Sequence, residues 1–211
     1  MPQIIDISSE LSASSITLAA KILQAGEVII GPTDTLYGII ANANDDAAIH
    51  KIFAMKKRRP DHALPLIAAS LKQVRQFAVM SKLEQQIAEH FWPGPLTLIL
   101  EVRKGIQFNK SCKEKGTIAV RVPANEFNKK LAAASNGLIT ATSTNISGEQ
   151  PADHINNIDP DIAKAVVAIF DAGPSKSKQP STIIRVKNGK IDLIRQGPVA
   201  VEDIKKCIGN N

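Results

Sequence analysis

Cysteine and aromatic residues are scarce in this chain. Its 211 residues include two cysteines, Cys112 and Cys207, which lie far apart in lysine-rich surroundings. Two cysteines are too few for a disulfide framework and their spacing matches no metal site, so we expect free thiols in a reducing cytoplasm. Aromatic residues make up 4% of the chain, which leaves no platform for stacking nucleic-acid bases.

Other common signatures are missing as well. The four histidines show no HxxxH or HxH pairing, and neither nucleotide-binding pattern, GxxxxGK(S/T) or GxGxxG, occurs. The apolar runs are far shorter than the roughly 20 residues that cross a bilayer, and the N-terminus does not resemble a signal peptide. We therefore expect a soluble cytoplasmic protein with no membrane contact and no metal ion held by its own side chains.

Charge and hydropathy indicate one globular domain with a basic surface. The length suits a single domain, and an apolar content of 44% is ordinary for a globular protein. The formal net charge is +6. This excess favours polyanionic partners such as nucleotides, RNA or acidic lipids, although charge alone does not choose among them.

Helical and strand-like segments alternate along the sequence, which predicts an α/β fold. Helices are expected at 11–25, after the Asn-Asp-Asp cap at 44–46, and at 70–78, 82–91, 125–135 and 201–209. Strands are expected on both sides of the turn at 31–38, and at 64–69, 96–102, 117–122, 138–143, 166–170, 181–186 and 191–195. The Asn188-Gly189 pair predicts a hairpin, so the sheet should be mixed.

Four stretches contain polar or charged residues that packing in a protein core does not explain. Each lies at the end of a strand-like run, where open α/β sheets bind ligands. They are GPTDTLYG (31–38), MKKRRPDHALPL (55–66), TIAVRVP (117–123) and ATSTNISG (141–148). The last of these supplies hydroxyl and amide groups but no acid, histidine or cysteine. It therefore predicts a neutral hydrogen-bonding rim whose charged partners come from elsewhere in the chain.

The basic run at 56–59 and Arg121 are the candidate charges. Cations after a helix complement its dipole, but four in a row also suit phosphate oxygens, and the run alone leaves both interpretations open. Arg121 alternates with Ile118, Val120 and Val122, so it should share the other strand face with Ala119. A partly buried arginine needs an anion, either a ligand carboxylate or an internal acid.

Seven motifs together resemble the YrdC-like family, the L-threonylcarbamoyladenylate synthases. They are PTDTLYG, Lys-x-Arg-Pro at 57–60, WPGPLTLIL at 92–100, TIAVRVP, Ser-x-Asn at 143–145 followed by Ser-Gly, PSTIIRV at 180–186 and LIRQGPV at 193–199. The resemblance covers residues 12 to 206 or so. It implies one twisted α/β domain with a mixed sheet over residues 1–211 and a large, basic concave face.

The resemblance also implies a nucleotidyltransferase activity. Members of this family combine L-threonine, bicarbonate and ATP, with Mg²⁺, into threonylcarbamoyl-AMP and pyrophosphate. Their product passes to a transferase complex that modifies adenosine in tRNA. The carbamate oxygen attacks the α-phosphorus and needs no general base for that step, so catalysis would depend on positioning and charge neutralisation.

The resemblance also implies which residues form the site, because each family motif has its counterpart at a matching position of this sequence. Lys57, Arg59, Ser143 and Asn145 correspond to the catalytic Lys-x-Arg and Ser-x-Asn motifs. L-Threonine would contact Thr33, Arg121, Ser143 and Ser181. ATP would contact Lys57, Arg59, Thr117, Asn145 and Arg195.

Two other functions remain open from the sequence. A basic concave face also suits an RNA backbone, so a non-catalytic RNA-binding protein, or direct RNA contact by the enzyme, is the main alternative. A protein of the same fold acting on a different acyl adenylate is the second. Convergence of the named residues on one cavity would favour the synthase, because a backbone binder needs only diffuse positive charge.

Overall fold

The structure is a computed structural model and describes residues 1–57, 63–135, 137–175, 177 and 179–209. The predicted phosphate ligand Arg59 lies outside the described residues. One mixed sheet runs through the molecule and confirms the predicted α/β fold class. Its strands, in spatial order, are β1 (Gln3–Asp6), β9 (Ala168–Asp171), β2 (Ile29–Gly31), β3 (Gly38–Asn42), β8 (Ile139–Ser143), β4 (Leu66–Ile67), β7 (Thr117–Arg121), β6 (Leu96–Val102), β10 (Thr182–Lys187) and β11 (Lys190–Arg195), with β5 (Ala78–Val79) also paired to β6.

The helices begin where the sequence supplies capping residues. They are α1 (Ala13–Gln24), α2 (Asp46–Met55), α3 (Leu71–Phe77), α4 (Lys82–Phe91), α5 (Glu126–Ala134), α6 (Pro160–Lys164) and α7 (Val201–Gly209). A Ser, Asp or Asn side chain caps each of the first six, and Ser81 and Glu84 form a full capping box on α4. Such caps stabilise a helix by about 1 kcal/mol each.

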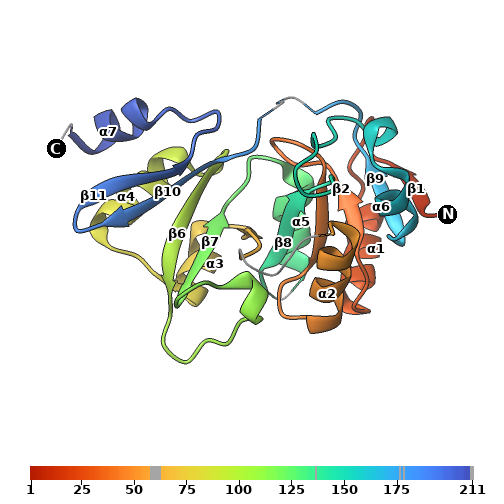
Figure 1. Cartoon of the computed structure of the whole chain (residues 1–211), viewed down its shortest axis with the longest axis horizontal. Helices are drawn as coiled ribbons and strands as arrows, with labels where there is room; N and C mark the ends of the chain where they lie inside the picture. Colours follow the sequence, from red (N-terminus) through yellow and green to blue (C-terminus); the bar gives the residue numbers. More distant parts are fainter. Residues whose placement is uncertain (58–62, 136, 176, 178, 210–211) are drawn as a thin grey trace.

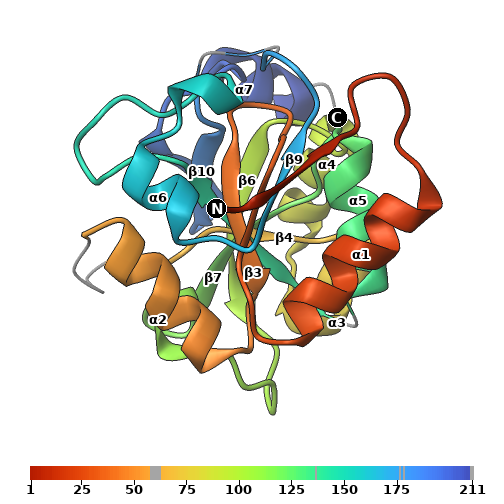
Figure 2. The same cartoon turned by 90° about the vertical axis from the view of Figure 1, so that its right-hand side faces the viewer.

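Two helical layers enclose the N-terminal half of the sheet. Helices α1 and α5 cover one face of β2, β3 and β9, while α2 and α6 cover the other (Figure 2). Side chains alternate between the two cores: Ile29 and Ile40 pack toward α1 and α5, whereas Ile30 and Ile39 pack toward α2. These strands are continuous apolar runs because both of their faces are buried.

The C-terminal half of the sheet is covered on one face. Ile87 of α4 and Ile204 of α7 join Leu98 and Ile184 in one core on that side, and α4 and α7 lie beside the β10–β11 hairpin (Figure 1). The hairpin turns at Asn188 and Gly189, both with positive φ, as the Asn-Gly pair predicts. The opposite face of β6, β7 and β10 lines a cavity.

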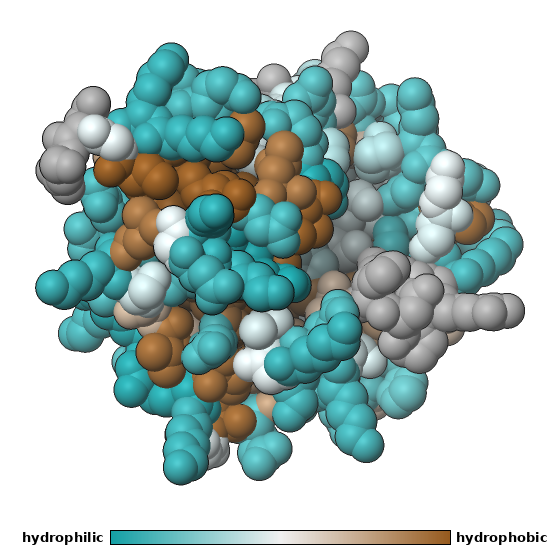
Figure 3. All heavy atoms as spheres, turned by 60° about the vertical axis from the view of Figure 1, so that its left-hand side comes forward, coloured by the Kyte–Doolittle hydropathy of each residue, from teal (hydrophilic) through white to brown (hydrophobic). Residues whose placement is uncertain are grey.

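The molecule's β11 end also carries apolar surface. Figure 3 turns this end toward the viewer and shows apolar side chains gathered in a band among polar ones. Strand β11 contributes two large exposed apolar residues, Leu193 and Ile194. Within the described part of the chain, no helix combines the length and apolar character that crossing a bilayer requires.

The expected elements are present, with three additional strands and α-helices. Strands β1 and β5 have four and two residues and helix α6 has five, which is too short to give a clear period in the sequence. Strand β1 is held by parallel pairing to β9, a contact between residues more than 160 positions apart. Both cysteines are free, as expected.

Gly197 allows the segment after β11 to touch the start of β10. A Cβ at this position would lie 2.3 Å from the carbonyl oxygen of Pro180 and 2.4 Å from the amide nitrogen of Thr182. The Gly197 amide donates to the Thr182 hydroxyl, which also accepts from the amide of Val199. This close backbone contact fixes the segment that carries Ser181.

Replacing Gly197 with alanine should destabilise the protein, because the added carbon can be accommodated only by moving backbone. We expect Gly197→Ala to lower the free energy of unfolding by about 1–3 kcal/mol. Gly137→Ala is the matched control, since its Cβ would meet nothing closer than 3.9 Å. Urea denaturation of both variants measures the difference, and equal stabilities would contradict the close contact.

Candidate active site

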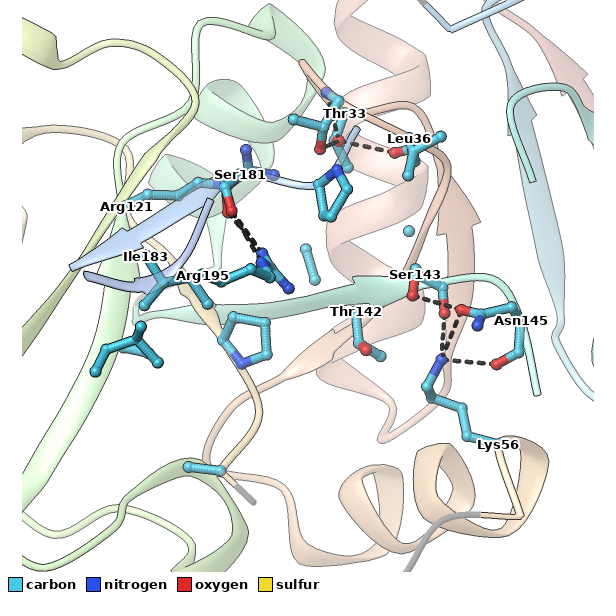
Figure 4. A pocket seen from close by; sticks show the side chains of 18 of the residues that line it. Thr33, Leu36, Lys56, Arg121, Thr142, Ser143, Asn145, Ser181, Ile183 and Arg195 are labelled. Carbon is cyan, nitrogen blue, oxygen red and sulfur yellow. Dashed lines mark hydrogen bonds between the residues drawn. The ribbon is translucent and has the colours of Figure 1, made fainter. Parts of the chain in front are cut away.

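The cavity has a volume of about 800 Å³ and collects side chains from distant parts of the chain (Figure 4). This is the size range of small-molecule sites. Every predicted site residue within the described ranges lines it: Thr33, Lys57, Thr117, Arg121, Ser143, Asn145, Ser181 and Arg195. The cavity occupies the sheet face that the helices leave open and extends onto the turn at 31–38.

Thr33 is already hydrogen-bonded within its own turn. Its hydroxyl donates to the carbonyl oxygen of Leu36 at 2.7 Å and accepts from the amide of Thr35 at 3.0 Å. The Thr35 hydroxyl lies 2.9 Å away as well. Because these bonds use the Thr33 proton and oxygen, the side chain mainly shapes the cavity wall (Figure 4).

Tyr37 anchors the other end of this turn. Its hydroxyl lies 2.7 Å from the carbonyl oxygen of Gly173 and 3.2 Å from a carboxylate oxygen of Asp171, and it accepts from the amide of Ala172. Burial, with a further contribution from the Asp171 charge, raises the pKa of Tyr37 to about 12. The phenol therefore stays neutral and ties the turn to the end of β9.

Arg121 forms a buried ion pair with Asp34. Its Nη1 lies 2.6 Å from Oδ1 of Asp34, and both side chains are 8% exposed. Neither atom has a further hydrogen-bond partner among the residues that the structure describes, while the other carboxylate oxygen of Asp34 accepts from the amide of Ala124. Burial lowers the pKa of Arg121, and Asp34 opposes that shift. The guanidinium keeps its charge and retains donors for a ligand.

This pairing answers one question that the sequence left open. An internal acid does accompany Arg121, and the cavity beside it is open. The predicted alternation is confirmed, since Ala119 and Arg121 line the cavity while Ile118, Val120 and Val122 are buried in the core.

Ser181 and Arg195 form a second polar cluster next to Arg121. Arg195 donates from Nε and Nη2 to the Ser181 carbonyl oxygen at 3.0 and 2.8 Å, and from Nη2 to its hydroxyl at 3.1 Å (Figure 4). Partial burial and the nearby Arg121 charge lower the pKa of Arg195. Arg121, Arg195 and Asp34 together carry one net positive charge, which suits a single carboxylate.

Lys56 holds the Ser-x-Asn loop. The residue is 3% exposed, and its Nζ donates to the carbonyl oxygens of Ser143 and Asn145 at 2.5 and 2.7 Å and to Oδ1 of Asn145 at 3.2 Å. The Ser143 hydroxyl donates to the same Oδ1, and the Asn145 amide group donates to Ile146 and Glu149 carbonyls. Asn145 is therefore fully hydrogen-bonded within the protein.

The run Lys-Lys-Arg-Arg contains two overlapping Lys-x-Arg patterns, one beginning at Lys56 and one at Lys57. Lys57 is exposed with a φ of 47° and lines the cavity, whereas Lys56 makes the contacts to the Ser-x-Asn loop. The pattern starting at Lys56 is thus the one linked to Ser143 and Asn145. The family motif gave Lys56 no role of its own, although its spacing from Ile49, Ile52 and Phe53 continues the buried face of α2.

The remaining cavity residues include Thr117, Glu114 and Arg185. The Thr117 hydroxyl donates to the carbonyl oxygen of Glu114 at 2.8 Å. Among the described residues, no group of three or more His, Cys, Asp and Glu side chains could hold a metal ion. Within those ranges, the donors of the cavity do not fit a magnesium site built by the protein alone.

The sequence matches a family model named Sua5_yciO_yrdC, described as telomere recombination, over residues 21–197. The chain belongs to the Sua5/YciO/YrdC family. A Methanocaldococcus jannaschii member, provisionally named a threonylcarbamoyl-AMP synthase, is 31% identical over 97% of this chain and 96% of its own. The Pyrococcus abyssi threonylcarbamoyl-AMP synthase is 33% identical over 99% of this chain and 62% of its own, so this chain spans about three-fifths of that relative.

A solved structure of the family also contains a ligand. The Pyrococcus abyssi Sua5 structure described as complexed with L-threonine superposes with a TM-score of 0.89 at 32% identity. The superposition covers 98% of this chain and 61% of that one. Membership of the Sua5/YciO/YrdC family thus agrees with the resemblance found in the sequence.

The two lysines should differ in their contribution to stability. Lys56→Met removes a buried ammonium group and leaves two carbonyl oxygens without their donor, so we expect the free energy of unfolding to fall by about 2 kcal/mol or more. Lys57→Met, on an exposed side chain, should change it by less than about 0.5 kcal/mol. Denaturant titration of both variants tests this, and a stable Lys56→Met protein would refute the anchoring role.

Proposed function

We propose that this protein is an L-threonylcarbamoyladenylate synthase that forms threonylcarbamoyl-AMP and pyrophosphate from L-threonine, bicarbonate and ATP. One observation carries the proposal: the Arg121–Ser181–Arg195 cluster and the Lys56–Ser143–Asn145 cluster converge on one open cavity. The name and the L-threonine ligand of the Pyrococcus abyssi relative support it. The product would supply a tRNA-modifying transferase, in the cytoplasm.

The first cluster suits the amino acid. The guanidinium of Arg121 has donors free of hydrogen bonds to described residues, and the net charge of this cluster matches one carboxylate. Ser181 offers a hydroxyl that lies 2.9 Å from that of Thr97. A threonine held here by its carboxylate would direct its amine toward the centre of the cavity.

The second cluster suits the phosphates. Lys57 presents its charge at the cavity edge, and Lys56 keeps the Ser143 hydroxyl and its loop in place. Arg59, outside the described residues, remains a predicted phosphate ligand. Mg²⁺ would enter with ATP as part of the substrate, and we assign no protein ligand to it.

The chemistry then follows from placement. The amine of threonine and bicarbonate give a carbamate and water, and a carbamate oxygen attacks the α-phosphorus as pyrophosphate leaves. The attacking oxygen is already anionic, so the step needs no general base. Fixed positive charge on both sides of the reaction centre lowers the electrostatic cost of bringing the anions together.

Pyrophosphate release should require all three substrates. The purified protein with ATP, bicarbonate, L-threonine and Mg²⁺ should produce pyrophosphate, and omission of any one substrate should reduce the rate to background. A non-catalytic RNA-binding protein would release none. Release that does not depend on threonine would refute the assigned amino-acid substrate.

Arg121→Ala should raise the threonine concentration needed for half-maximal rate by about tenfold or more, because hydrogen bonds to charged groups contribute about 1.5–3 kcal/mol each. The single variant also leaves Asp34 buried without its partner, which costs about 3–5 kcal/mol of stability. Arg121→Ala combined with Asp34→Ala removes that cost and should restore stability but not threonine affinity. Wild-type threonine dependence in the double variant would show that Arg121 serves only to pair with Asp34.

A further inference from the structure

Arg185 is a cavity residue to which the proposed reaction assigns no role. It lies on β10, and its side chain lines the cavity together with Ile183 of the same strand. Its Nε is buried and has no hydrogen-bond partner in the part of the chain that the structure describes. A buried donor that stays unpaired loses its hydrogen bonds to water without replacement, so a ligand acceptor is the expected partner.

No acid of the described residues pairs with this guanidinium. Asp192 stands directly across from Arg185 on β11, but it does not accept a hydrogen bond from the Arg185 Nε. Glu114 lines the cavity and is exposed. Arg185 therefore differs from Arg121, which has Asp34, and from Arg195, which donates to Ser181.

On the side of β6 and β7, the neighbours of Arg185 are apolar. The strand register places it in one row with Ile99 of β6 and Ala119 of β7. Ile183 and Ile194 complete this part of the cavity lining. Alkyl side chains beside a guanidinium suit a flat heteroaromatic ring, which packs on the alkyl groups and presents ring nitrogens to the arginine.

The register sets Arg185 apart from Arg121 and from the lysine cluster, whereas Arg195 lies opposite Ile183 on the adjacent strand β11. Arg185 pairs with Ile99 of β6, which pairs with Ala119 of β7, and Arg121 lies two residues beyond Ala119. Two strand spacings and two residues along the strand correspond to about 12 Å between the Cα atoms of Arg185 and Arg121. Strand β8, which carries Ser143, is four strands away, or about 19 Å. Arg185 thus lies at the opposite end of the cavity from the lysines that suit phosphate.

We propose that Arg185 recognises the purine base of the nucleotide, with its guanidinium donating to a ring nitrogen of adenine while the ring packs against Ile99 and Ile183. The proposal rests on the nucleotide substrate of the proposed function and adds the residue that distinguishes a nucleotide from a bare polyphosphate. The base contact is assigned to Arg185 rather than to Arg195, because Arg195 already donates from Nε and Nη2 to Ser181.

Calorimetric binding of ATP and of inorganic tripolyphosphate, each with Mg²⁺, tests this role. We expect Arg185→Gln to weaken ATP binding by about tenfold or more and to leave tripolyphosphate binding unchanged. Arg185→Lys keeps the charge but loses the planar donor set, so it should weaken ATP binding as well. Lys187→Gln is the matched control, because Lys187 is an exposed cation on the same strand outside the cavity, and it should change neither affinity.

Three outcomes would overturn the proposal: unchanged ATP affinity in Arg185→Gln, equal loss of ATP and tripolyphosphate affinity, or wild-type ATP affinity in Arg185→Lys. Thermal unfolding of each variant confirms that it is folded, and Arg185→Lys gives the result if Arg185→Gln does not fold. Pyrophosphate release by the wild-type protein is measured separately. Failure of the proposed reaction is therefore distinguishable from failure of the base contact.

Discussion

The buried pair of Arg121 and Asp34 is the interaction on which the site depends. It joins β7 to the turn at 31–38, which Tyr37 also ties to the end of β9. An arginine buried alone would carry a desolvation cost of several kcal/mol, and the acid offsets part of it. Because Arg195 lies close by, the pair also sets the charge of this end of the cavity to a value that suits one carboxylate.

The polar residues of the cavity divide into two kinds. Thr33 and Asn145 have their hydrogen-bonding groups occupied by the protein, so they act by fixing the wall and the Ser-x-Asn loop. Apart from its ion pair with Asp34, Nη1 of Arg121 has no partner among the described residues, and Nε of Arg185 has none. A prearranged wall reduces the ordering cost of binding, and the unpaired donors supply the attraction.

The strand and helix positions could be predicted because they depend on local pattern. The alternation of side chains along a strand predicted that Arg121 and Ala119 share one face, and the Asn188-Gly189 pair predicted the position of the hairpin. Strand β1 could not be found in this way, since its four residues are held by pairing with a distant strand. The family motifs similarly named residues that do gather at one cavity, but they did not say which contacts those residues make.

The pairings across the site needed the structure. Asp34 and Arg121 are 87 positions apart, and no period or motif links them. Lys56 is a different case. Its spacing from the buried residues of α2 predicts that it is buried, but its place in a run of four cations suggests an exposed charge instead. A buried lysine needs several acceptors, and the Ser-x-Asn loop provides them.

The cavity itself follows from how the helices are distributed over the sheet. Both faces of the N-terminal half are covered, whereas β6, β7 and β10 have α4 and α7 on one face and the cavity on the other. Side chains that alternate toward the open face therefore become the floor of the site, and their order across the strands sets the order of ligand groups. From β10 to β8 that order is alkyl groups with Arg185, then Arg121 on β7, then the Ser-x-Asn loop that Lys56 holds. A reaction centre between the last two has fixed cations on both sides, which is the arrangement an attack by one anion on another requires.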